Sequence, residues 1–273
     1  MPGLRTLKFA LAVFTLGLSE WQPAKRIGRL GLHRLCRVIL RLRSADYLID
    51  ELKTALVIAP HPDDEAFGCG GLIAGKRLDG HPVHVIFLTD GSASHPKHPT
   101  LTPTVLVNLR QQEARESLSK LGVDSTMIHF LGVRDGTLAQ LSAPESANIT
   151  EQLNQFLLTI KPDEVFLPCR NDGSSEHEAA FLLLQSAVNK TTPQPRILEY
   201  PVWSWWNPFL LLRSCFTRRR ILRFNLGGYG FLKKAAIACH HSQVEPCPPW
   251  TQPVQSSDFT RLFLSKEEFF YEN

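Results

Sequence analysis

The chain has 273 residues, of which 43% are hydrophobic and 21% are charged, and its net charge is +4. This length and apolar content allow one substantial core, which excludes a wholly disordered protein and favours one domain with an extension. The six cysteines show no CxxC pair and no disulfide-framework spacing, so we expect a reducing compartment.

Residues 1–45 form a basic segment. They hold nine Lys or Arg against one acid, so they carry +8 and the rest of the chain carries −4. Helical spacing predicts an amphipathic helix. Its basic face holds Arg26, Arg29, His33, Arg37 and Arg41, and its apolar face holds Ile27, Leu32, Leu35, Val38, Ile39 and Leu42. Such a helix suits an anionic membrane surface, and docking on its own domain with a solvated basic face is the alternative.

An apolar run over residues 9–18 precedes this helix. Ten residues are too few to span a bilayer. The run resembles the core of a signal peptide, but no small-x-small cleavage site follows it. We expect shallow insertion into the membrane interface, and no nucleic-acid partner because no aromatic residues there are placed for base stacking.

The most informative stretch, Ala-Pro-His-Pro-Asp-Asp-Glu over residues 59–65, follows an apolar run that predicts a buried strand. Ligands of open α/β sheets bind at this end of the strands. His61 and Asp64 are three residues apart, so one helix-like turn can aim both at a single cation, whereas Asp63 points elsewhere. The alternative is a surface loop whose acids cap the next helix.

Three glycines follow within the next predicted helix, namely Gly68, Gly70 and Gly71. Each costs a helix about 1 kcal/mol relative to alanine. Their presence therefore predicts that the helix backbone closely approaches the sheet or a ligand.

Strand-like and helix-like stretches alternate through the remainder of the chain. The predicted strands are 54–59, 83–88, 127–131, 164–168 and 196–200, and the predicted helices are 66–78, 106–121, 147–160 and 176–189. The alternation predicts an α/β domain over residues 46–273, with a mostly parallel sheet covered by helices on both faces. Ser175 and Glu178 have the spacing of a capping box, which places His177 in the first turn of the last helix.

Residues 203–220 combine tryptophans with a cluster of arginines. Aromatic faces bind sugars and lipid interfaces, and arginines bind phosphate. A lid or substrate-recruiting loop and packing against the N-terminal helix explain this composition equally well.

Six motifs in one order resemble the PIG-L/LmbE-like family of zinc-dependent de-N-acetylases. They lie at residues 59–71, 88–91, 110–115, 130–136, 199–203 and 234–243. The resemblance covers most of residues 54–245 and implies a Rossmann-like sheet. By position it implies that His61, Asp64 and His177 bind zinc, with Fe²⁺ or Co²⁺ also suited to these ligands.

The resemblance also implies catalytic roles. Asp63 would be the general base for water attacking an acetamide, and His240 would be a second oxyanion stabiliser or a general acid. Arg110 and Asp135 would hold sugar hydroxyls or a phosphate, although Arg110 could instead form an ion pair on a solvated helix face. One departure is Ser174, which stands where many family members have a histidine, so that histidine's task falls elsewhere or is lost.

The implied function is metal-dependent hydrolysis of the acetamide of an N-acetylglucosamine-type sugar. We expect a lipid-linked substrate, or one from a cell-surface glycan or glycolipid pathway, and a cytoplasmic enzyme held peripherally at the inner face of the membrane. One alternative is the same reaction on a soluble N-acyl glycoside, such as a thiol precursor or natural product. The other is a non-catalytic membrane-associated binding protein on the same fold, which only Ser174 favours.

Overall fold

The computed structural model describes residues 22–272, and side chains from residue 28 onward, so the insertion predicted for residues 9–18 lies outside the described residues. In the described part, eight strands form one sheet in the order β1-β7-β8-β6-β5-β2-β3-β4. The strands are β1 Ser44–Asp46, β2 Ala55–Ala59, β3 Val83–Thr89, β4 Ile128–Val133, β5 Glu164–Pro168, β6 Arg196–Tyr200, β7 Arg220–Asn225 and β8 Glu267–Glu272.

The sheet is mostly parallel, as predicted. Strand β8 is antiparallel to both of its neighbours, β6 and β7, and every other pair of neighbouring strands is parallel. All five predicted strands are present with ends within two residues of the expected ones. Strands β1, β7 and β8 were not predicted.

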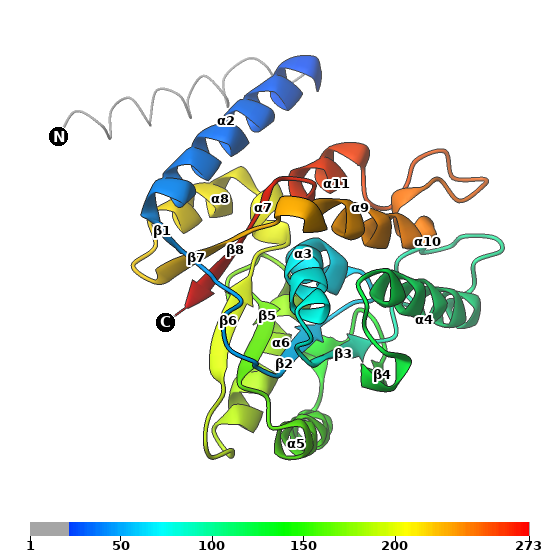
Figure 1. Cartoon of the computed structure of the whole chain (residues 1–273). Coiled ribbons are helices and arrows are strands. Elements are labelled where there is room, and N and C mark those ends of the chain that lie inside the picture. Colours follow the sequence, from blue (N-terminus) through cyan, green and yellow to red (C-terminus); the bar gives the residue numbers. More distant parts are fainter. Residues whose placement is uncertain (1–21, 273) are drawn as a thin grey trace.

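Helices cover both faces of the sheet (Figure 1). They are α2 Gln22–Arg43, α3 Asp64–Leu78, α4 Pro103–Lys120, α5 Ala143–Ile160, α6 Ser175–Val188, α7 Trp203–Trp206, α8 Pro208–Cys215, α9 Gly230–Cys239, α10 His241–Val244 and α11 Ser257–Phe263. Alternate side chains of β2 supply two cores: Val57 packs with α3, α4 and α9, whereas Leu56 packs with α5 and α6. The four predicted helices are confirmed, each beginning one to four residues earlier than expected.

The predicted capping box at the start of α6 is wrong. Helix α6 begins at Ser175 itself, and its N-cap is Ser174, whose side chain accepts no capping hydrogen bond. A capping box does occur at α5, between Ser142 and Glu145. His177 nevertheless lies in the first turn of α6, as expected.

The predicted close approach at the glycines of α3 is confirmed. A Cβ atom at Gly68 would lie 2.1 Å from the ring of Tyr200, and one at Gly71 would lie 1.7 Å from the side chain of Leu226. Helix α3 therefore packs so closely against β6 and the loop after β7 that no side chain fits between them.

We expect Gly68→Ala to lower the free energy of unfolding by about 1–3 kcal/mol, because the added methyl group overpacks the core. The Tyr200 ring is buried and its hydroxyl donates a 2.7 Å hydrogen bond to the Ile58 carbonyl, so it cannot move aside freely. Urea unfolding measures the change. Gly31→Ala, on an exposed part of α2 with nothing within 4 Å, should be neutral or stabilising; equal effects at the two positions would contradict the explanation.

Helix α2 docks on the domain, alongside α8 (Figure 1). Several of its basic side chains contact the domain. Arg37 Nη2 donates to the Leu262 carbonyl at 2.7 Å, and Arg41 forms a 2.9 Å ion pair with Glu267. Burial lowers the pKa of Arg37 to about 10, and nearby Arg41 acts in the same direction. Docking of this helix on its own domain, the alternative that the sequence left open, is therefore confirmed, but the expected solvation of its basic face is wrong.

The outward face of α2 carries apolar side chains instead. Leu35, Val38 and Leu42 are 56%, 52% and 80% exposed. The basic face of α2 packs on the domain because carboxylates, carbonyls and tryptophan rings there interact with its guanidinium groups. No helix in residues 22–272 is long and apolar enough to cross a membrane.

Candidate active site

The predicted metal ligands meet at the C-terminal ends of the central parallel strands. His61 and Asp64 follow β2, and His177 follows β5 in the first turn of α6. One ligand atom of each lies within 4.8 Å of those of the other two. Asp64 Oδ2 is 3.1 Å from His61 Nδ1 and 3.3 Å from His177 Nε2. The sheet topology thus joins residues more than one hundred positions apart.

The donor set fits a divalent metal. His177 is fully buried, and its Nε2 atom has no hydrogen-bond partner among the described residues. A buried polar atom without a partner costs about 1–3 kcal/mol, which a bound cation would remove. Two imidazoles and one carboxylate are ligands that zinc, iron and cobalt accept.

Asp172 holds His177 in the orientation that metal binding requires. Its Oδ2 atom lies 2.8 Å from His177 Nδ1, so that Nδ1 carries the proton and Nε2 keeps its lone pair free. The same carboxylate accepts hydrogen bonds from the backbone N–H groups of Val202, Trp203 and Ser204. Sequence reasoning missed Asp172, although a carboxylate beside a strand end and five residues before a histidine was an available signal.

We expect Asp172→Asn to weaken metal affinity about 10- to 100-fold, because the amide no longer fixes the His177 tautomer. Competition against a chromophoric chelator measures the affinity, and a thermal melt of the metal-free protein reports any loss of fold. The matched control is Asp79→Asn, an exposed aspartate at the opposite end of α3. Unchanged metal affinity in a folded Asp172→Asn protein would refute the assigned role.

A second group of possible ligands shares His61. His61 Nε2 is 2.8 Å from Glu176 and 3.4 Å from Asp135. Glu176 was not predicted, and its other oxygen accepts hydrogen bonds from the N–H groups of Gly136 and Leu138, each at 3.0 Å. Glu176 therefore already has hydrogen-bond partners for both oxygens, which favours the group that contains His177, whose Nε2 atom makes no hydrogen bond to any described residue.

Asp63 lies beside this centre and faces Arg110. The two side chains are buried, and Arg110 Nη2 is 3.3 Å from Asp63 Oδ2. Burial raises the pKa of Asp63 above its ordinary value, although the positive charge of Arg110 opposes the shift. A carboxylate in this state is suited to take up and return a proton.

Arg110 is not part of a solvated ion pair. It is 3% exposed and donates to the carbonyls of Gly91 and Pro62, at 3.0 Å each. Glu113, its expected partner, instead accepts hydrogen bonds from the backbone and hydroxyl of Ser242. The alternative reading of this helix is therefore wrong.

His240 is fully buried, with Nε2 at 3.2 Å from Glu65 and Nδ1 without a hydrogen-bond partner among the described residues. Burial alone would lower the pKa of His240, but the Glu65 carboxylate outweighs it and the pKa is raised. His240 interacts electrostatically with Asp63 but does not line the cavity. Its partner Glu65 was not predicted.

The centre opens into a cavity of about 210 Å³. His61, Asp63, Asp64, Arg110 and Asp135 line it together with Phe67, Val202, Trp203, Gln243 and Phe259. The aromatic rings of Trp203 and Phe259, whose centroids are 5.2 Å apart, offer the kind of apolar wall that binds a sugar face.

The tryptophan-rich segment contributes side chains to two parts of the molecule, the cavity and the contact with α2. Trp203 lines the cavity, whereas Trp205 packs on His33 with ring centroids 4.7 Å apart and Trp206 lies 3.8 Å beneath Arg29. Packing against the N-terminal helix is therefore confirmed for Trp205 and Trp206. A lid or substrate-recruiting role for the segment stays a prediction. Ser174 is not among the residues that line the cavity.

Comparisons with known proteins show which family the sequence resembles. The sequence model of the PIG-L family, described as GlcNAc-PI de-N-acetylase, matches residues 56–188. A diacetylchitobiose deacetylase of Thermococcus kodakarensis is 30% identical over 155 residues, which cover 54% of this chain and 55% of that protein. A probable N-acetyl-alpha-D-glucosaminyl L-malate deacetylase of Bacillus subtilis is 33% identical over 100 residues, which cover 36% of this chain and 44% of that protein. The chain thus spans about half the length of these curated relatives.

Solved structures show the same fold. The N,N'-diacetylchitobiose deacetylase of Pyrococcus horikoshii aligns with a TM-score of 0.55 and 23% identity over 78% of this chain and 79% of that one. A 4-carboxy-2-hydroxymuconate hydratase of Pseudomonas putida also aligns, with a TM-score of 0.60 and 19% identity over 77% and 82% of the two chains. The fold therefore carries more than one chemistry, and the function has to be argued from the site.

Proposed function

Since the chain belongs to the PIG-L family, whose sequence model matches residues 56–188, we propose that this protein is a metal-dependent de-N-acetylase of an N-acetylglucosamine-type sugar. The observation that carries the proposal is the meeting of His61, Asp64 and a His177 nitrogen that makes no hydrogen bond to any described residue, beside a buried aspartate. Relatives named as deacetylases of such sugars support it.

The chain's own residues divide the reaction between them. A divalent metal held by His61, Asp64 and His177 would supply Lewis-acid chemistry to the acetamide and to water. Asp63 accepts the proton of the water that attacks the carbonyl carbon. It then delivers that proton to the sugar nitrogen as the C–N bond breaks, so that acetate and a free amine result. Arg110, fixed by two carbonyls, keeps the Asp63 carboxylate in place.

The remaining residues position the sugar. The rings of Trp203 and Phe259 exclude water from one side of the cavity, and Asp135 offers carboxylate oxygens to sugar hydroxyls. We assign His240 to the electrostatic support of Asp63, because it is buried behind the cavity wall and does not line it.

The test is amine release from a panel that holds N-acetylglucosamine, N,N'-diacetylchitobiose and a lipid-linked N-acetylglucosaminide. We expect metal-dependent release of acetate and amine in equal amounts from at least one member. A preference for the lipid-linked member supports a glycolipid pathway, and a preference for the others supports a soluble glycoside. No release from any member by protein with stoichiometric metal would overturn the proposal.

We further propose that the protein binds peripherally to anionic membranes, at the inner face, through the outward face of α2. The exposed side chains of Leu35, Val38 and Leu42 form an apolar stripe next to exposed Arg34, and the apolar run of residues 9–18 precedes the helix. Insertion of such a stripe beside cations is how interfacial helices bind.

We expect the double substitution Leu35→Gln and Leu42→Gln to reduce co-sedimentation with phosphatidylglycerol vesicles about tenfold or more, because it removes apolar area from the inserting face. Leu182→Gln is the matched control, since Leu182 is 61% exposed on α6. If the control lost as much binding as the double variant, or if wild-type protein did not bind vesicles, the stripe would not be a membrane surface.

A further inference from the structure

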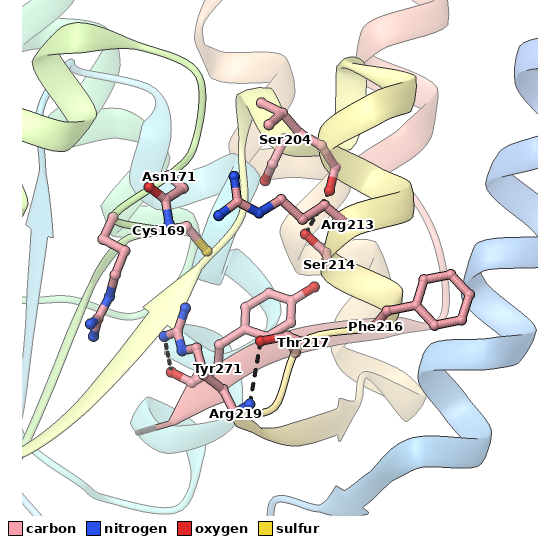
Figure 2. Close-up of a pocket in the computed structure, with 11 residues that line it drawn as sticks. Cys169, Asn171, Ser204, Arg213, Ser214, Phe216, Thr217, Arg219 and Tyr271 are labelled. Atoms are coloured by element: carbon pink, nitrogen blue, oxygen red, sulfur yellow. Dashed lines mark hydrogen bonds between the residues drawn. The ribbon is translucent and has the colours of Figure 1, made fainter.

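We propose that a second cavity, beside the active site, binds a phosphate group of a monoester or diester. It has a volume of about 280 Å³ and lies between the end of β5, helix α8 and the start of β7 (Figure 2). Arg170, Arg213 and Arg219 line it, and none of the described residues that line it is acidic. This is the composition of a site for a multiply charged anion.

A buried glutamate holds two of these arginines against the cavity. Glu199, 1% exposed, forms ion pairs of 2.6 Å with both Arg170 and Arg219. The backbone N–H of Arg170 also donates to this carboxylate, at 2.9 Å. Since one carboxylate faces two guanidinium groups and Arg213 adds a third, these four side chains together carry a net charge of +2.

The cavity also contains donors that lack acceptors. The side chain of Arg213, which is exposed, forms no hydrogen bond or ion pair with any other described residue. The buried Nε atom of Arg219 also has no hydrogen-bond partner among them. Figure 2 shows Arg213 reaching from α8 toward Asn171 and Cys169, with Arg219 on the opposite side of the space. Guanidinium groups bind phosphate oxygens through paired N–H donors, so these two arginines could hold one phosphate between them.

The position of the cavity connects it with two other features. Ser204 lines it, whereas the preceding residue, Trp203, lines the active-site cavity, and Asp172 accepts hydrogen bonds from both backbone N–H groups. One turn of chain is therefore the common wall of the two cavities. On the outer side, Phe216 lines the mouth and is 64% exposed, so that a phosphate carried by a lipid could place its acyl chains there.

Phosphate binding is tested without turnover, so its result does not depend on the proposed deacetylase. We expect inorganic phosphate to bind metal-free wild-type protein in isothermal titration calorimetry, and chloride at matched ionic strength not to bind. Arg213→Gln should weaken binding about tenfold or more, because it removes a charged fork of donors from an exposed position without disturbing the core.

The matched control is Arg218→Gln, which removes the same charge from a neighbouring exposed arginine that does not line the cavity. Arg218→Gln should bind phosphate as wild type does. If both substitutions weakened binding equally, or if phosphate produced no more heat than chloride, the proposal would be overturned.

The source of the phosphate is decided with glycerol 3-phosphate and with vesicles of phosphatidylcholine that contain phosphatidic acid. Binding of the soluble ester alone, lost in Arg213→Gln, supports the proposal and assigns a soluble phosphate ester. Vesicle binding that Arg213→Gln weakens and Arg218→Gln does not supports it and assigns a lipid headgroup. Binding of neither ligand, or binding that does not depend on Arg213, would contradict a phosphate site.

Discussion

Asp63→Asn is expected to lower kcat for deacetylation by about 10²- to 10⁴-fold while the protein keeps its fold and its metal. The amide has the size of the carboxylate and can accept a hydrogen bond from Arg110, which lies 3.3 Å from Asp63, but it cannot take a proton from water. Because Asp63 lines the cavity without being one of the grouped ligand residues, only the chemical step should suffer.

The measurement combines kcat on the best substrate of the panel with the metal content of each purified variant. Asp79→Asn, the exposed aspartate at the far end of α3, should retain wild-type kcat. A variant that loses its metal together with its activity would show that Asp63 acts as a ligand. Near wild-type kcat with full metal would mean that another group is the base.

The central strands could be predicted because each is a nearly continuous apolar run between turn residues, as in a strand buried on both faces. Strands β7 and β8 lack this pattern, since Arg220 and Arg223 alternate with apolar residues in one and glutamates begin and end the other. Their charges pair across the sheet: Arg220 lies 3.1 Å from Glu272. The place of a charged residue in a strand can be explained only when its partner is known.

The same dependence on distant partners explains which residues of the site could be predicted from the sequence and which could not. His61 and Asp64 lie within one turn, and their spacing alone predicted that they share a cation. Glu176, Asp172 and Glu65 act through histidines that reach them from other elements or turns, so nothing local separates them from surface acids. The predicted orientation of the basic face of α2 was wrong for a related reason. Which face docks depends on the carboxylates and aromatic rings that it contacts, and these lie far away in the sequence.

His177→Ala is expected to abolish stable metal binding and to reduce deacetylation to background. It removes the only imidazole nitrogen of the grouped ligand residues that makes no hydrogen bond in the described structure. Wild-type protein stripped by a chelator should lose activity likewise and recover it when zinc, Fe²⁺ or Co²⁺ is added, whereas the variant should not recover. Metal content and kcat are measured on the same samples.

His241→Ala is the matched control, because His241 is an exposed histidine whose loss should change neither quantity. The experiment also separates the two groups of possible ligands. If the metal sat instead between His61, Asp135 and Glu176, His177→Ala would keep its metal and Glu176→Gln would lose it. Retention of metal in Glu176→Gln together with its loss in His177→Ala would place the cation beside Asp64, within reach of the aspartate that moves the proton.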